Sequence, residues 1–302
     1  ILRFNQQAPR FLDAPGDEPS LGEYLVAHGY SDEFVEHYIL PMGAAIWSAG
    51  LQNMRQFPAR YFIRFFHNHG MLSVDDRPQW RTIRGGSTRY VEKLTRPFRS
   101  RIGLNTPVEL IQRTPAGVLL KAEGCEAARF DCVFLACHSD QALRLLGDAS
   151  DSEREILGTM GYQRNDVVLH TDVSVLPKRK LAWAAWNYHL LERDTGRVAV
   201  TYNMNLLQRL QTRMPLLVSL NMTDRIDPAA IIKRLEYEHP VHTHQAVAAQ
   251  SRQAEINGVN RTYFCGAYWR FGFHEDGVVS ALAALDHFRQ REHAQRALHR
   301  IA

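Results

Sequence analysis

The stretch from Gly266 to Val278 combines residue types and spacings that could do chemistry. Three glycines, Gly266, Gly272 and Gly277, surround an aromatic loop, and Glu275 and Asp276 stand directly before the last of them. Glycine lets a flat or charged ligand approach the backbone closely. The unpaired N–H groups at the start of a helix attract negative charge. The stretch therefore predicts a site for a phosphate or another anionic group, although an ordinary turn between a strand and a helix would have the same layout.

A histidine cluster, His239, His242 and His244, is the second such group. In a strand, His242 and His244 would point to the same side, which is a spacing that zinc can use. No acidic or thiol ligand lies nearby in the sequence, so we expect no metal here. Nor is there a Gly-x-Ser-x-Gly motif, so hydrolysis by a catalytic serine is not expected either.

A strand and a helix must position the first group. Tyr263-Phe264-Cys265 is a short apolar run that ends at Gly266, which is typical of a buried strand. After the glycines, apolar residues recur at helical spacing and predict a helix with one apolar face: Val278, Leu282, Leu285 and Phe288.

The rest of the chain reads as helices followed by mixed structure. Capping and proline signals predict three helices within the first seventy residues, the first of them after a capping box formed by Ser20 and Glu23. Strands are expected at residues 108–111, 118–122 and 130–136. A second, antiparallel sheet is expected at 167–171, 181–186, 197–202 and 216–220. We also expect helices at residues 205–213 and 228–237.

Several stretches resemble one enzyme superfamily. They are PMGAAIWS at residues 41–48, Trp186-Asn187-Tyr188, and the segment from Cys265 to Val278. Together they resemble the FAD-dependent amine oxidase and phytoene desaturase superfamily, and more closely the bacterial flavin-containing amine oxidoreductases. The resemblance implies a mixed α/β (α+β) fold. It would comprise a glutathione-reductase-like FAD domain, incomplete at its N-terminus, and a substrate domain of helices on an antiparallel sheet.

The resemblance also implies domain bounds and site residues. Residues 1–80 and 151–255 would form the substrate domain, and 81–150 with 256–302 the C-terminal part of the FAD-binding domain. Trp186, Tyr188 and Phe273 are the candidates for the substrate pocket. FAD would be contacted by Val108, Gly266, Ala267, Gly272, Glu275, Asp276, Gly277 and Val278.

Two of these cofactor positions call for comment. Val108 would meet the adenine through its backbone, although core packing explains an apolar residue there equally simply. Ala267 stands where many relatives have an acidic residue, so only backbone contacts are expected at that position.

No Gly-x-Gly-x-x-Gly lies between a strand and a helix, and the first residue is Ile1. In dinucleotide-binding proteins that motif wraps the pyrophosphate. The resemblance therefore implies that the chain is the C-terminal part of a longer protein. On that basis we expect the 302 residues alone to bind FAD poorly and to be inactive by themselves.

Composition narrows the class of protein. With 45% hydrophobic and 23% charged residues the sequence is typical of a globular protein, and it has no apolar run long enough to span a membrane. The net charge is +4 without a basic block, which argues against nucleic-acid binding. The four cysteines lack Cys-x-x-Cys spacing, which predicts buried free thiols and a cytoplasmic location.

The expected activity is FAD-dependent transfer of hydride from a substrate C–N or C–C bond to the flavin. A small-molecule amine and an apolar, lipid-like substrate for desaturation or isomerisation both remain open. A non-catalytic fragment that acts through protein contacts is the alternative from another class. A homodimer is also possible.

Overall fold

The computed structural model describes residues 1–75, 78–191 and 196–301, with side chains up to residue 293. The chain divides into two compact units, Ile1–Ser100 with Tyr162–His239 and Arg101–Gly161 with Pro240–Ala302. These boundaries differ from the expected ones. Residues 151–161 and 240–255 fall in the second unit because their helices share its core, in which Ile156 and Leu157 pack with Ala246 and Ala249. Residues 81–100 fall in the first unit.

The first unit begins with a group of short helices. Their bounds are α1 Leu2–Phe11, α2 Leu21–Ala27, α3 Asp32–Phe34, α4 Leu40–Trp47, α5 Leu51–Arg55, α6 Ala59–Asn68 and α7 Thr88–Thr95, with a π-helical turn at Val35–Ile39. Ser20 caps α2 in the expected capping box with Glu23. A Cβ at Gly43 would lie 2.6 Å from Met54 and 2.7 Å from Phe62, so a glycine is required where these helices meet.

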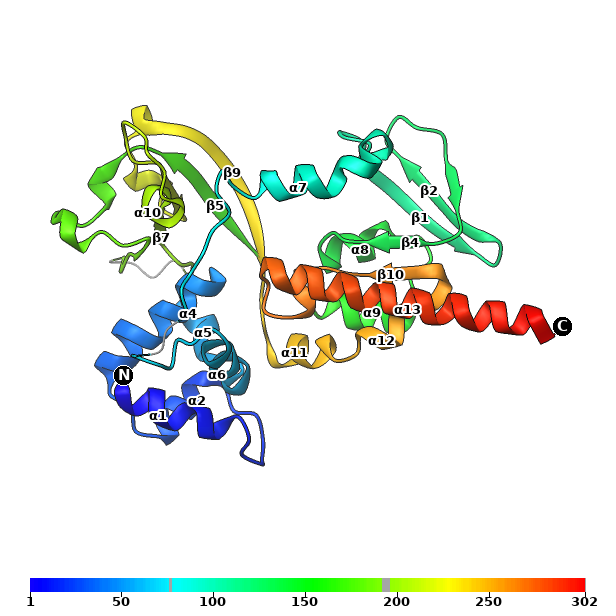
Figure 1. Ribbon diagram of the computed structural model, residues 1–302. Coiled ribbons are helices and arrows are strands. Elements are labelled where there is room, and N and C mark those ends of the chain that lie inside the picture. The colour runs from blue at the N-terminus through cyan, green and yellow to red at the C-terminus, as the bar shows by residue number, and fades with distance from the viewer. Residues whose placement is uncertain (76–77, 192–195, 302) are drawn as a thin grey trace. The chain divides into compact units, whose positions relative to one another are not determined.

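A five-stranded sheet completes the first unit, in the order β6-β7-β8-β5-β9 (Figure 1). The strands are β5 Tyr162–His170, β6 Trp186–Tyr188, β7 Val200–Asn203, β8 Leu217–Leu220 and β9 Ile231–Pro240, with the short helix α10 Met204–Gln208 after β7. The pairs β6–β7, β7–β8 and β5–β8 are antiparallel, as expected.

The helix expected at residues 228–237 is wrong, because β9 occupies most of that range. Lys233, Arg234 and Glu236 favour a helix locally, but β5 offers a row of backbone partners. The Thr171 N–H donates to the Ala230 carbonyl at 3.1 Å. Pairing with a neighbouring strand overrides a weak local propensity.

The second unit holds two small sheets. β1 Val108–Thr114, β2 Gly117–Ala122 and β3 Ala128–Phe130 form an antiparallel meander. β4 Val133–Leu135 pairs in parallel with β10 Thr262–Phe264, which confirms that the two distant segments associate. The single strand expected at 130–136 is therefore two strands in different sheets, separated at Asp131 and Cys132.

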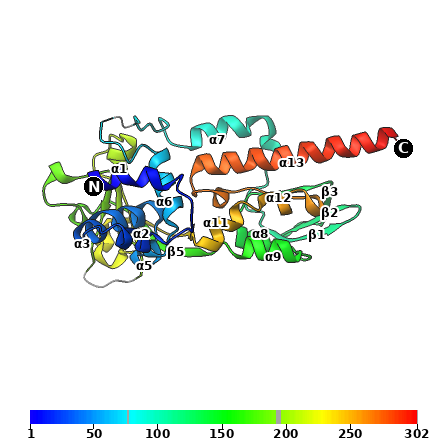
Figure 2. The same ribbon diagram turned by 90° about the horizontal axis from the view of Figure 1, so that it is seen from below.

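Helices flank the two-stranded sheet: α8 Ser139–Leu145, α9 Asp151–Gly158, α11 His244–Gln250, α12 Gln253–Ile256 and α13 His274–Ile301. In both views α13 runs beside β10 (Figure 2). No helix in the described ranges is both long enough and apolar enough to cross a membrane. The four cysteines are free thiols, but of the four only Cys265 is buried. Cys132 and Cys137 are half-buried, and Cys125 lies exposed in the turn after β2.

The core of the second unit contains an ion pair. Arg113 on β1 donates two hydrogen bonds to the carboxylate of Glu153, at 2.6 and 2.8 Å. The exposed fractions of these side chains are 2% and 0%. Asp148 accepts a third bond at 2.8 Å from the Nε of Arg113. Desolvation alone would raise the pKa of Glu153, but the bonds from Arg113 outweigh it and the pKa lies below its usual value.

Candidate functional site

The end of β10 leads into the candidate site. Tyr263 and Phe264 are buried, and the chain then passes through Gly266 into a short 3-10 turn, Ala267–Trp269. A Cβ on Gly266 would lie 2.5 Å from the ring of Tyr268. Only glycine therefore lets the strand end turn this closely over an aromatic ring.

A buried hydroxyl ties this strand end to the first turn of α13. Ser280, with an exposed fraction of 2%, accepts a hydrogen bond from the Gly266 N–H at 2.8 Å and donates one to the Gly277 carbonyl, also at 2.8 Å. Sequence reasoning did not single out Ser280. The sequence did offer a signal for it: Ser280 lies three residues after Gly277, and residues three apart lie on the same face of a helix.

A side chain in the first turn of α13, that of Asp276, caps the start of this helix. Asp276 accepts a hydrogen bond from the Phe273 N–H at 3.0 Å, and its other oxygen lies 3.4 Å from the Nε of Arg270. Its carboxylate is buried against the loop, where a capping role explains it. Glu275 next to it is exposed.

Gly277 presents an open face. A Cβ added there would meet no atom within 4 Å. In the first turn of an α-helix the N–H groups have no acceptor within the helix. The N–H of Gly277 itself donates to the Phe273 carbonyl at 3.2 Å, so the N–H groups that lack an intrahelical acceptor belong to the residues before it. The corner therefore places an uncrowded glycine beside the positive end of a 28-residue helix, which suits an electron-rich or anionic ring edge.

The remaining predicted cofactor residues occupy two places in the second unit. Gly272, with a left-handed φ of 96°, and Val278, 54% exposed, flank the corner, and Ala267 lies half-buried at its base. Val108 lies in another sheet, on β1, and packs partly buried against the core. Its backbone contact with an adenine stays a prediction.

The three substrate candidates divide between the units. Trp186 and Tyr188 lie on β6 of the first unit, where Trp186 is 40% exposed and packs edge-on against Tyr202 with ring centroids 5.3 Å apart. Phe273 precedes α13 in the second unit and is half-buried. A shared pocket of these residues stays a prediction.

A hydrogen-bonded chain across the first unit's sheet was not foreseen. Its four members stand on four successive strands or strand ends: His189, Thr201, Ser219 and His170. The distances between their side-chain atoms are 2.9, 2.7 and 2.8 Å in that order. Thr201, Ser219 and His170 are 0% or 1% exposed.

The backbone fixes the direction of this chain. The Asp172 N–H donates to the Nδ1 of His170 at 3.2 Å, so the imidazole proton sits on Nε2 and is donated to Ser219. Ser219 can then donate to Thr201, whose own hydroxyl proton is shared between His189 and the Sδ of Met222, 3.6 Å away. Burial lowers the pKa of both His170 and His189, which keeps both rings neutral at pH 7. The chain satisfies buried hydroxyl and imidazole groups across four neighbouring strands, and so ties the sheet together.

The histidine cluster holds no metal-binding group. Thr243 caps α11, so His244 begins a helix, whereas His242 precedes it and is 4% exposed. Among the residues that the structure describes, no three His, Cys, Asp or Glu side chains are placed to bind a metal ion. Burial lowers the pKa of His242 to about 4.

Solved structures share this fold. Cyclohexylamine oxidase from Brevibacterium oxydans matches 96% of this chain and 74% of its own, at 14% identity and a TM-score of 0.62. Putrescine oxidase bound to putrescine matches 94% and 73%, at 12% identity and 0.61. A CLA-producing fatty acid isomerase from P. acnes matches 95% and 84%, at 13% identity and 0.55. Neither models of protein families nor curated protein sequences give a match.

These likenesses establish the fold. The expected fold class, mixed helix and sheet with helices on an antiparallel sheet, is confirmed. At 11–14% identity they do not extend to a particular reaction.

Proposed function

We propose that the protein is an FAD-dependent oxidoreductase that transfers hydride from a substrate C–N bond to the flavin. The observation that carries the proposal is the corner between β10 and α13. There, no atom crowds the side-chain position of Gly277 in the first turn of α13, in a fold that cyclohexylamine and putrescine oxidases share. The resemblance of the segment from Cys265 to Val278 to flavin-binding sequences supports the choice of cofactor.

The residues present at this corner fit a flavin. No atom lies within 4 Å of the point where a Cβ would stand at Gly277, so this position leaves room for a planar ring, whereas the ring of Tyr268 already packs against Gly266. FAD, when bound, supplies the hydride acceptor. The N-terminus of α13 would stabilise negative charge on the ring edge beside it. Ser280 and Asp276 would act as positioning residues, because they hold the strand end and the helix start in place.

The substrate candidates that the resemblance implies are Trp186 and Tyr188 on β6 and Phe273 before α13, and an aromatic ring face attracts the ammonium group of an amine. An apolar lipid-like substrate is the second candidate, and the fatty acid isomerase with the same fold favours it. Either substrate class uses the same flavin corner.

The proposal is tested on the full-length polypeptide that carries this sequence. We expect the purified protein to show a flavin absorbance band that an amine such as putrescine or cyclohexylamine bleaches without oxygen. Bleaching by linoleic acid alone would identify the lipid class instead. Preparations that contain no flavin, and take none up from added FAD, would refute the proposal.

A matched pair of variants localises the cofactor. Gly277→Ala adds a methyl group into open space and improves helix propensity by about 1 kcal/mol, so it controls for folding. Gly277→Glu adds bulk and a negative charge at the same point, and we expect it to weaken FAD binding strongly. Equal flavin content in the two variants would show that this corner does not contact the ring.

A further inference from the structure

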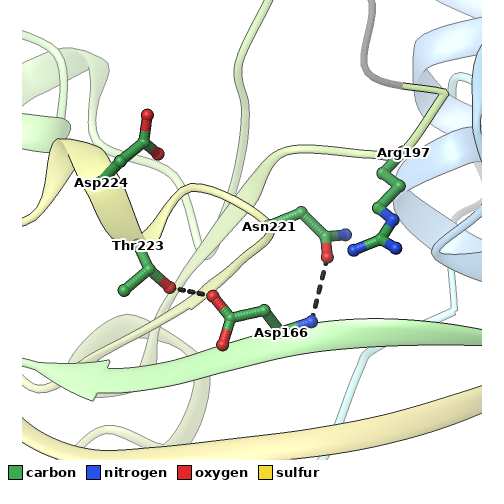
Figure 3. Close-up of a pocket in the computed structure, with 5 residues that line it drawn as sticks. All are labelled: Asp166, Arg197, Asn221, Thr223 and Asp224. Atoms are coloured by element: carbon green, nitrogen blue, oxygen red, sulfur yellow. Dashed lines mark hydrogen bonds between the residues drawn. The ribbon is translucent and has the colours of Figure 1, made fainter.

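A cavity of about 450 Å³ in the first unit contains charged groups that the fold leaves unused (Figure 3). It is lined by Asp166 on β5, Arg197 ahead of β7, and three residues that follow β8, namely Asn221, Thr223 and Asp224. Its volume lies in the range of small-molecule sites, and all five residues that line it have polar side chains. Which of the five side chains are free to bind a ligand follows from their hydrogen bonds.

The side chain of Asn221 has a structural role. It has a left-handed φ of 57°, a conformation that asparagine tolerates better than most residues. Its Oδ1 accepts from the Asp166 N–H at 3.0 Å, and its Nδ2 donates to Asn165 and to the Val198 carbonyl, both at 2.8 Å. The amide is therefore fully used in joining β5, β8 and the approach to β7, and it gives the cavity a fixed wall.

Thr223 is engaged as well, because its hydroxyl donates to one carboxylate oxygen of Asp166. From the residues that the structure describes, the second oxygen of Asp166 accepts no such bond. Within the described ranges, neither the guanidinium of Arg197 nor the carboxylate of Asp224 forms a hydrogen bond or an ion pair. Three groups are thus available to a ligand: one guanidinium and two carboxylates.

These groups stand on different sides of the cavity. Figure 3 shows Arg197 beside Asn221, with Thr223 and Asp224 beyond Asn221 on the other side. A guanidinium is a planar fork that matches a carboxylate with two parallel hydrogen bonds. The two aspartates suit an ammonium group. We propose that this cavity binds a small zwitterion, a molecule of amino-acid type with one carboxylate and one ammonium.

The charge balance favours a zwitterion over a simple anion. One arginine and two aspartates give the lining a net charge of −1, so a doubly charged phosphate would be attracted by Arg197 but repelled by both carboxylates. A zwitterion places an opposite charge against each. The site lies wholly in the first unit and needs no flavin. The proposal can therefore be tested independently of the proposed oxidoreductase function.

Binding is measured by isothermal titration of the 302-residue chain with matched probes. The series of glycine, β-alanine, 4-aminobutyrate and 6-aminohexanoate varies the spacing of the two charges, and butyrate and butylamine each lack one charge. We expect saturable binding of at least one zwitterion, about tenfold or more tighter than either single-charge analogue. Inorganic phosphate binding in preference to every zwitterion would overturn the proposal, and so would the absence of saturable binding by all four.

Variants assign the binding to this cavity. Arg197→Gln and Asp224→Asn alter exposed side chains that form no hydrogen bond or ion pair within the described ranges, so both proteins should fold normally, which circular dichroism checks. Each variant should lower the affinity for the zwitterion by about tenfold. Arg197→Gln removes the partner of its carboxylate, and Asp224→Asn removes a partner of its ammonium. Arg234→Gln on β9 removes another exposed arginine and should leave affinity unchanged. Zwitterion binding that survives Arg197→Gln unchanged would place the site elsewhere and refute the assignment.

Discussion

Replacing Glu153 by glutamine should destabilise the second unit by about 3 kcal/mol. Breaking a buried ion pair by removing one charge costs about 3–5 kcal/mol, because the other charge stays buried. Arg113 is 2% exposed and would lose its bidentate partner, but Asp148 still accepts from its Nε. That residual pair places the expected cost at the lower end. Glutamine keeps the length needed for the capping contact with Ser150.

The control is Glu155→Gln, two residues along α9. Glu155 pairs with Arg252 at the surface, where an ion pair contributes little. Urea unfolding of both variants gives the global effect. Hydrogen exchange of peptides from β1 and β10, which Arg113 and its neighbour Thr262 occupy, reports on the second unit alone. Equal protection of β1 and β10 in the two variants would refute the stabilising role of the pair.

The pH dependence gives an independent check of the same pair. The folded-state pKa of Glu153 is lowered, so its contribution is present above the unfolded pKa of about 4.3 and is lost as pH falls through the folded value. Wild type should therefore lose stability relative to Glu153→Gln as the solution is acidified below about pH 4.3. A constant difference between the two proteins down to pH 2 would contradict this sign.

Three further perturbations test other contacts. Ser280→Ala leaves the Gly266 N–H without its acceptor and should cost about 1–3 kcal/mol in thermal unfolding, whereas Ser251→Ala at an exposed position should cost much less. His242 has a pKa of about 4 in the folded protein and about 6.5 in the unfolded chain, so on acidification the unfolded chain is protonated at this residue before the folded protein is. Stability should fall by about 3 kcal/mol between pH 6.5 and 4, a slope that His242→Gln removes. Ser219→Ala interrupts the buried chain and should cost about 1–3 kcal/mol in urea unfolding, and a stability equal to wild type would show that the chain contributes nothing.

The sequence predicted those parts of the fold that local chemistry decides. Ser20 was correctly predicted as a helix cap because the capping box lies within four residues. The β10–α13 corner followed from one apolar run, a glycine and a helical stripe. The β9 strand was missed, since residues 228–237 form it only against β5 and local propensity favoured a helix. The break between β3 and β4 was missed for a related reason, because each half pairs with a strand that is distant from the other's partner.

The candidate site shows the same limit more sharply. The glycines at the β10–α13 corner are visible in the sequence because they lie within twelve residues of one another. The chain from His189 to His170 joins residues on four strands, and it exists only because Thr201 lies opposite Ser219 in the β7–β8 register. A shift of one residue in that register would turn every side chain of one strand to the other face. Chemistry that depends on register between distant strands therefore cannot be predicted from spacing along the chain, whereas chemistry built on one turn can.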